Sequence, residues 1–355
     1  MKTTRALAEL GQSLWLDNIT RPMLDSGTLQ RYVDELHVTG LTSNPTIYDK
    51  AIGGSDAYAD QIAEGARTGR SGEDTFVAIA IDDLRRAADL FRPAFERTDG
   101  VDGFVSLEVS PLIAYDGDAT AAEAKRLHKL GERPNLYIKI PGTPEGLPAI
   151  EASIFGGVPI NVTLLFSPAQ YLAAAEAYTR GIERRIEAGL SAYVPSVASL
   201  FVSRWDPKTK DRLPEDLQNG LGLAIGHQCY ADYRSFFGSE RWQRLIAQGA
   251  RPQRLLFAST GTKDPALPKT LYITGLAAPA TVNTMPEETL LATSESEEPV
   301  TPLDPNPGDP LAPFRRVGID IDQVAGELQR DGAESFVKSW SSLLDRIAGK
   351  VAAVA

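Results

Sequence analysis

The sequence predicts an α/β fold in which eight parallel strands alternate with helices and close into a (β/α)8 (TIM) barrel, with extra N- and C-terminal helices. Short apolar, β-branched runs recur along the chain, and helix-like amphipathic segments separate them. Each run is apolar on both faces except at its C-terminal end, as in parallel strands that are buried on both sides. The 355 residues fit one barrel with insertions, so we expect a single domain over residues 1–355.

The predicted strands are distributed along most of the chain. They cover residues 14–17, 38–43, 104–109, 136–140, 160–166, 192–199, 255–259 and 271–275. A helix-like stretch follows Met1 and lacks the apolar region of a secretory signal. No apolar run reaches the roughly 18 residues of a membrane-spanning helix. We therefore expect a soluble protein of the cytoplasm that has no membrane partner.

Three of the intervening helices are visible from local patterns. Residues 76–95 carry apolar side chains at three-to-four spacing, with charged residues on the opposite face. Ser167 followed by Pro168 matches an N-cap with proline at the first helical position, and this helix is expected to run to about residue 187. A shorter helix is expected over residues 144–152.

Two segments interrupt the regular alternation. Residues 205–216 are polar and contain proline, which indicates a surface excursion. Residues 284–313 are rich in Pro, Glu, Ser and Asp, which predicts an exposed acidic, Pro-rich loop. An amphipathic C-terminal helical segment follows over residues 321–351; we expect it to pack on the barrel and to break near Gly332.

Composition excludes several classes of function. The formal net charge of −11 argues against a nucleic-acid partner, although a few local cations suffice for a phosphorylated small molecule. The single cysteine, Cys229, excludes an intrachain disulfide and a Cys-rich metal site, and three scattered histidines disfavour a His-rich one. We expect Cys229 to be a buried, inert thiol on a helix.

One lysine stands out at the end of a predicted strand, where barrel active sites lie. Lys139 interrupts the otherwise apolar run 136–140, and a lysine is costly to bury. Burial favours the neutral form of an amine, which can attack a carbonyl to form a Schiff base. A structural lysine on an edge strand, or one whose ammonium extends to the surface, is the alternative, and this strand alone leaves both open.

Two acidic residues strengthen the catalytic interpretation of Lys139. Asp17 and Glu108 are each the only acid at the end of an apolar strand, so in one barrel both converge on the lysine. Carbon–carbon cleavage through an imine needs one group to move protons during dehydration and another to take the hydroxyl proton. Each acid alone could instead be a helix N-cap or an ion-pair partner.

Seven segments at these strand ends resemble those of the transaldolases, in order and over nearly the whole chain. They are 15–18 (WLDN), 40–46 (GLTSNPT), 105–111 (VSLEVSP), 138–143 (IKIPGT), 157–167 (GVPINVTLLFS), 196–204 (SVASLFVSR) and 256–260 (LFAST). One short segment occurs by chance, but seven in order are a specific signal. The resemblance implies a class I aldolase-like barrel. It also implies an enzyme of the non-oxidative pentose phosphate pathway.

The resemblance also implies a reaction and its catalytic residues. A dihydroxyacetone unit would pass from sedoheptulose 7-phosphate or fructose 6-phosphate to glyceraldehyde 3-phosphate or erythrose 4-phosphate, with no metal and no organic cofactor. By matched motif, Lys139 would form the Schiff base and Asp17 would handle the hydroxyl proton in aldol cleavage. Glu108, with Thr163 and a trapped water, would shuttle protons during imine formation.

Substrate-binding residues follow from the same resemblance. Those for the dihydroxyacetone end would be Asn44, Asn161 and Ser199. Arg204 matches a phosphate-binding arginine and suits bidentate recognition. Many relatives carry a second arginine where this chain has Gly261, and we hypothesise that Lys263 supplies the missing charge beside Ser259.

Two other functions remain to be weighed. Fructose 6-phosphate aldolases share the fold and the lysine, but the resemblance implies that they are shorter and lack the counterpart of Glu108. A catalytically silent barrel that binds sugar phosphates would lack at least one of Lys139, Asp17 and Glu108, and all three are present. The expected partners are thus sugar phosphates, and the expected assembly is a monomer or homodimer.

Overall fold

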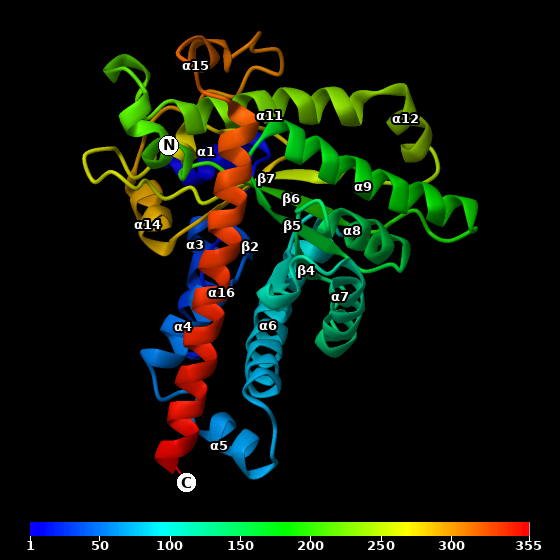
Figure 1. The fold of residues 1–355 in the computed structure, drawn as a ribbon, viewed down its shortest axis with the longest axis vertical. Helices are drawn as coiled ribbons and strands as arrows, with labels where there is room; N and C mark the ends of the chain where they lie inside the picture. The colour runs from blue at the N-terminus through cyan, green and yellow to red at the C-terminus, as the bar shows by residue number, and fades with distance from the viewer. Residues whose placement is uncertain (355) are drawn as a thin grey trace.

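A computed structural model describes residues 1–354 and shows the (β/α)8 barrel (Figure 1). The strands are β1 (Ser13–Leu16), β2 (Val38–Leu41), β3 (Val105–Glu108), β4 (Leu136–Pro141), β5 (Ile160–Leu165), β6 (Ser196–Phe201), β7 (Arg254–Ala258) and β8 (Val282–Met285). They lie in the order β2-β1-β8-β7-β6-β5-β4-β3, and all paired neighbours are parallel. The Leu41 amide donates to the Phe104 carbonyl at 3.0 Å, which links β2 to the start of β3 and brings the two ends of the sheet together.

Helices follow most strands and surround the sheet. In the first half they are α1 (Thr3–Leu10), α2 (Arg21–Asp25), α3 (Thr28–Leu36), α4 (Pro45–Gly53), α5 (Ala59–Arg67), α6 (Gly72–Arg97), α7 (Gly117–Gly131) and α8 (Gly146–Phe155). In the second half they are α9 (Pro168–Glu187), α10 (Trp205–Thr209), α11 (Leu221–Gly238), α12 (Glu240–Ile246), α13 (Leu271–Thr274), α14 (Glu287–Glu295), α15 (Ala312–Arg316) and α16 (Ile321–Val354). Short 3₁₀ turns lie at η1 (Pro111–Ile113), η2 (Lys210–Arg212) and η3 (Glu215–Leu217).

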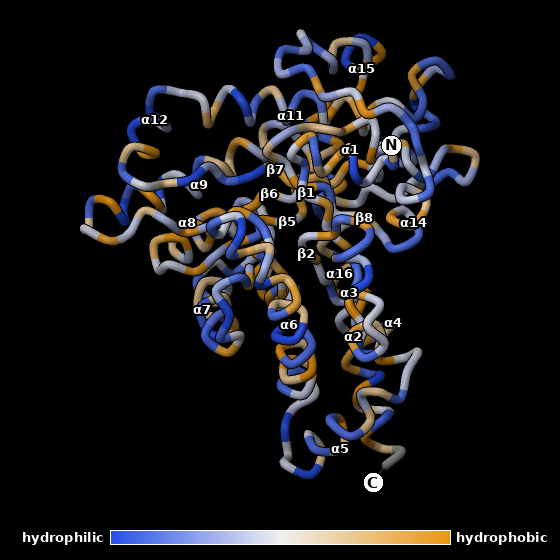
Figure 2. Tube along the Cα trace, turned by 180° about the vertical axis from the view of Figure 1, so that it is seen from behind, coloured by the Kyte–Doolittle hydropathy of each residue, from blue (hydrophilic) through white to orange (hydrophobic). Residues whose placement is uncertain are grey.

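Aromatic side chains pack together inside the barrel, toward the N-terminal ends of the strands. The rings of Phe104 and Tyr137 stack with centroids 4.1 Å apart, and Trp15 packs on Tyr137. The Trp15 indole donates to Asp102 Oδ1 at 2.8 Å, so its only polar atom is satisfied. Figure 2 shows apolar segments gathered at the strands, with hydrophilic loops outside. A packed barrel interior leaves the opposite, C-terminal face for chemistry.

Seven of the eight predicted strands are confirmed, with ends that differ by up to four residues. The eighth is wrong: residues 271–274 form α13, and the last strand is β8. The apolar run at 271–275 is too short for its periodicity to separate a helix from a strand. Tyr272 turns inward to bond Asp206, whereas β8 contains Asn283 and Thr284 and so lacks the apolar signal.

The predicted helices and the environment of the cysteine are also found. Helix α9 begins as expected, because Ser167 Oγ accepts from the Gln170 amide and Pro168 follows it. Helix α6 covers the whole segment predicted at 76–95, and α8 covers residues 146–152 of the segment predicted at 144–152. Cys229 lies buried on α11, and burial raises the pKa of its thiol. No helix among residues 1–354 is both long and apolar enough to cross a bilayer.

Three segments differ from the prediction. Trp205 is fully buried and its indole donates to the Phe166 carbonyl, so the excursion at 205–216 starts inside the protein. Residues 284–313 are not a loop throughout, since they begin in β8 and include α14, which buries Leu290. Helix α16 continues through Gly332 without a break and lies along α4, α5 and α6 (Figure 1).

Candidate active site

A cavity of about 340 Å³ opens at the C-terminal ends of the strands. Eight of the ten predicted site residues line it: Asp17, Asn44, Lys139, Thr163, Ser199, Arg204, Ser259 and Lys263. Glu108 and Asn161 are not part of its lining, and each contacts a residue that is: Lys139 in the first case, Ser199 in the second. The structure thus brings the ten predicted residues together from seven strands and their following loops.

Lys139 is the buried lysine of this cavity. Three lysines line it, and only Lys139 is buried, at 4% exposure, whereas Lys50 and Lys263 are exposed. Its ammonium nitrogen donates to the Ser43 carbonyl at 3.1 Å and lies 3.2 Å from Glu108 Oε2. Strand β4 pairs with β3 on one side and β5 on the other. The alternative of a lysine on an edge strand is therefore wrong.

The two carboxyl groups both face Lys139 and sit in a low-dielectric environment. Burial raises the pKa of Asp17, against the opposing effect of Lys139 and a 2.7 Å hydrogen bond from Thr42 Oγ1. Burial likewise raises the pKa of Glu108, and Lys139 opposes that shift. Asp17 is not a helix cap, because Thr20 caps the next helix, α2. The ion-pair partner of Glu108 is Lys139 itself.

The end of β5 is bent by a bulge. The pairing of β5 with β6 shifts register between Val162 and Leu165, and Leu164 has φ +59°. A left-handed backbone is costly for a leucine, so the surrounding contacts must hold it. Thr163, just before this point, has a buried hydroxyl with no hydrogen-bond partner among residues 1–354. Such a hydroxyl is available to a substrate atom or a water molecule.

Asn44 and Ser199 contribute polar groups to the cavity lining, and the Asn161 amide contacts Ser199. Ser199 Oγ donates to Asn161 Oδ1 at 2.7 Å, and Asn161 Nδ2 donates to Ser106 Oγ at 3.1 Å, so the Asn161 amide is held in one orientation. Asn44 caps α4, with its Oδ1 accepting from the Ile47 amide at 3.1 Å. This bond occupies the carbonyl oxygen of Asn44 and leaves its NH2 group to donate.

Cations gather at the outer end of the cavity. Burial lowers the pKa of Arg204. Lys263 is exposed overall, but partial desolvation of its amine, followed by the repulsion of Arg204, lowers the pKa of Lys263. Two neighbouring cations in one cavity attract an anion such as a phosphate. Gly261 also lines the cavity, and a Cβ there would lie 3.0 Å from Pro286 Cγ, so this position has no room for a side chain unless Pro286 moves.

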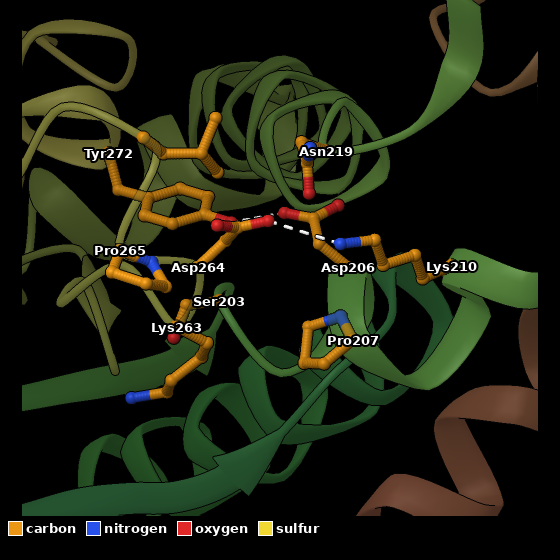
Figure 3. A pocket seen from close by; sticks show the side chains of 10 residues that line it. Ser203, Asp206, Pro207, Lys210, Asn219, Lys263, Asp264, Pro265 and Tyr272 are labelled. Carbon is orange, nitrogen blue, oxygen red and sulfur yellow. Dashed lines mark hydrogen bonds and ion pairs between the residues drawn. The ribbon is translucent and has the colours of Figure 1, made fainter. Parts of the chain in front are cut away.

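A second cavity of about 300 Å³ lies beyond Lys263 (Figure 3). Lys210 pairs with Asp264 at 3.1 Å, and Tyr272 donates to Asp206 across it. Figure 3 shows the Lys263 ammonium turned away from the Lys210–Asp264 pair. Lys263 is therefore not neutralised by the acid next to it in the sequence.

The cavity also contains residues that the sequence did not identify as site residues. Thr42 bonds both Asp17 and Thr284 Oγ1, the latter at 2.8 Å. Phe336, from α16, lies with its ring centroid 6.0 Å from Lys139 Nζ, and Lys50 adds a third cation. Thr42 is a polar residue at the end of the strand predicted at 38–43, whereas Phe336 lies on the apolar face of the helix predicted at 321–351, a pattern that indicates only core packing. No group of three or more His, Cys, Asp or Glu placed to hold a metal ion is found within residues 1–354.

Comparisons with known proteins identify the family. A family model described as transaldolase/fructose-6-phosphate aldolase matches residues 14–347. The chain is 45% identical over 359 residues to a transaldolase of Thermobifida fusca, covering 98% of both chains. It is 46% identical to a transaldolase of Acidothermus cellulolyticus (96% and 95% covered) and 42% identical to one of Thiobacillus denitrificans (98% and 100%). The chain therefore belongs to the transaldolase/fructose-6-phosphate aldolase family.

Proposed function

We propose that this chain is a transaldolase. It moves a dihydroxyacetone unit from sedoheptulose 7-phosphate or fructose 6-phosphate to glyceraldehyde 3-phosphate or erythrose 4-phosphate, through a Schiff base on Lys139. The observation that carries the mechanism is the buried Lys139 amine, 3.2 Å from Glu108 in a cavity that Asp17 also lines. The shared name of the full-length relatives supports the same reaction.

Formation of the Schiff base uses Lys139 and Glu108. The neutral amine attacks the ketone carbon C2, and the carbonyl oxygen takes a proton to give a carbinolamine. Because burial raises the pKa of Glu108, its carboxyl group is suited to donate that proton. The resulting carboxylate takes a proton from the newly bonded nitrogen and passes it to the carbinolamine hydroxyl, which leaves as water. The Thr163 hydroxyl has no hydrogen-bond partner in the described part of the chain and can hold the departing water. The product is a protonated imine.

Carbon–carbon cleavage uses Asp17 as the base. Its carboxylate takes the proton of the C4 hydroxyl, the C3–C4 bond breaks, and the electron pair moves to the imine nitrogen. An aldose phosphate leaves, and the three-carbon unit stays on Lys139 as an enamine. A raised pKa makes the Asp17 carboxylate a stronger base for this step. The enamine then attacks the acceptor aldehyde, and Asp17 returns the proton.

The cavity offers different chemistry to the two ends of the substrate. The dihydroxyacetone hydroxyls would bond to Asn44, Asn161 and Ser199, whose orientations are held by the bonds described above. The phosphate would be held by Arg204 and Lys263, with Ser259 beside them. We also propose that residues 1–355 act as one domain in the cytoplasm, as a monomer or homodimer in the pentose phosphate pathway.

Borohydride trapping tests the proposed Schiff base. Incubation with fructose 6-phosphate and borohydride should give one stable adduct, located at Lys139 by peptide mass. The other cavity lysines are matched controls: Lys50→Gln and Lys263→Gln should still give an adduct at high substrate concentration, whereas Lys139→Gln should not. An adduct on another lysine, or none in the wild type, contradicts the mechanism.

The acceptor dependence of product release separates transaldolase from fructose 6-phosphate aldolase. A transaldolase holds the three-carbon unit until an aldose phosphate arrives, so free dihydroxyacetone should be scarce with or without acceptor. Sustained release of dihydroxyacetone from fructose 6-phosphate alone would favour the aldolase.

A further inference from the structure

We propose that Gln329, on the C-terminal helix α16, is a positioning residue that holds the bulge at the end of β5 and thereby places the Thr163 hydroxyl for imine formation. This inference rests on the proposed function. Gln329 lies 165 residues beyond Leu164 in the sequence, and its side chain is buried at 8% exposure. It does not line the cavity.

The Gln329 amide joins the ends of the two strands that carry Lys139 and Thr163. Its Nε2 donates to the Leu164 carbonyl at 2.9 Å and to the Gly142 carbonyl at 3.0 Å. Between these carbonyls the Gly142 amide donates to the Thr163 carbonyl at 2.7 Å. The two strand ends are thus tied by one backbone bond and by both donors of a single side-chain amide.

The bulge needs such a restraint. Leu164 is buried at 1% exposure with φ +59°, a left-handed conformation that is sterically unfavourable for an L-residue with a Cβ. Without Gln329, the Leu164 carbonyl would lose this donor in a site that water does not reach, and the backbone would be free to relax. Relaxation toward a regular strand changes the direction of Thr163, because neighbouring residues of a strand point to opposite faces.

A glycine in α16 allows the helix to bring Gln329 close to the bulge. Gly332 lies three residues further, on the same face of the helix. A Cβ at Gly332 would lie 2.9 Å from Leu164 Cδ2 and 3.3 Å from an Arg204 guanidinium nitrogen. The glycine that was expected to break α16 instead lets the helix approach the bulge closely. The helix backbone stays continuous there.

The test compares two glutamines of the same helix. Gln329→Met keeps the length and apolar body of the side chain but removes both donors. The control is Gln323→Met, since the Gln323 side-chain amide bonds Glu327 at the surface. We expect Gln329→Met to lower kcat by about tenfold and to slow borohydride-trapped imine formation equally, with KM changed less than about twofold. The control should match the wild type.

A double-mutant cycle separates positioning from general destabilisation. If Gln329 acts through Thr163, Gln329→Met should cost little further activity in a Thr163→Ala background. Equal losses in both backgrounds, or wild-type kinetics in Gln329→Met, would overturn the proposal. Gln329→Glu provides a rescue: a carboxyl buried between two carbonyls is neutral and donates one hydrogen bond. Its kcat should lie between those of the wild type and Gln329→Met, and a kcat no higher than that of Gln329→Met counts against the proposal.

Hydrogen exchange tests this inference independently of the proposed function. Peptides that cover residues 160–166 should exchange faster in Gln329→Met than in the wild type or in Gln323→Met, whatever reaction the protein catalyses. Unchanged exchange overturns the restraint itself. A wild type without transaldolase activity but with faster exchange in the variant would refute the function and leave the restraint in place.

Discussion

Thr42 Oγ1 donates a 2.7 Å hydrogen bond to Asp17 Oδ1, joining the ends of β2 and β1 at the floor of the cavity. A hydrogen bond to a carboxylate favours its ionised form, and here it opposes the burial that raises the pKa of Asp17. Thr42 also contacts Thr284 Oγ1 at 2.8 Å, so the hydroxyl is fixed by two neighbours. The base of the proposed cleavage step is therefore tuned by a threonine that carries no charge.

Removing this donor should change the pH dependence of catalysis. In Thr42→Val the pKa of Asp17 rises further, and less of the carboxylate is ionised at a given pH. We expect kcat to fall by about tenfold at the acidic end of the range and by less at alkaline pH, so that the acidic limb of the profile moves to higher pH. Thr42→Ser keeps the hydroxyl and should keep the wild-type profile. A uniform loss at all pH values would contradict this role.

The ionised Asp17 side chain should also lower the stability of the folded protein. Its pKa is raised in the fold above the unfolded value, so the ionised side chain destabilises the native protein at neutral pH. Asp17→Asn should therefore abolish activity and raise Tm by about 1–3 °C at pH 7. Toward the unfolded pKa of about 3.9 the difference should vanish, because both side chains are then neutral. Thermal scans across this range check the sign, and a gain that persists at acidic pH contradicts it.

Much of the catalytic centre could be predicted because its residues interrupt apolar patterns. Lys139 and Glu108 are the charged residues of two otherwise uncharged strands, so each is conspicuous without any knowledge of its neighbours. The sequence of β8 offers no polar interruption of an apolar run, since Asn283 and Thr284 make it resemble a loop. The eighth strand is predicted instead at the more apolar segment 271–275, of which residues 271–274 form helix α13.

The contribution of α16 could not be read from the sequence. Phe336 belongs to a regular apolar stripe, and nothing local indicates that its ring lies 6.0 Å from Lys139 Nζ. A glutamine such as Gln329 on an amphipathic helix usually lies at the surface, and only the fold shows the two carbonyls that it bonds. Gly332 has two possible meanings, a break or a close approach, and only the neighbouring Leu164 decides between them.

Phe336 should keep water away from the imine on Lys139. Its ring lines the cavity beside the amine, and truncation would open this side to solvent. In Phe336→Ala we expect release of free dihydroxyacetone without acceptor to rise by about tenfold relative to transfer. Phe336→Leu keeps apolar bulk and should behave more like the wild type. An enzymatic assay of dihydroxyacetone, run with and without erythrose 4-phosphate, measures the partition, and an unchanged ratio excludes this role.

Lysine substitutions at the phosphate end of the cavity test the hypothesis that Lys263 replaces the arginine absent at Gly261. Lys263→Ala should raise KM for phosphorylated substrates by about tenfold and change kcat by less than about twofold, because the lost contact is made equally in the ground and transition states. Lys269→Ala is the control, since Lys269 pairs with Glu288 at the surface at 3.0 Å. Lys50 is the rival cation in the same cavity. If Lys50→Ala raises KM and Lys263→Ala does not, the charge comes from α4. With unphosphorylated glyceraldehyde as acceptor, the acceptor KM should be the same in Lys263→Ala and the wild type, because the lost cation then has no phosphate to bind.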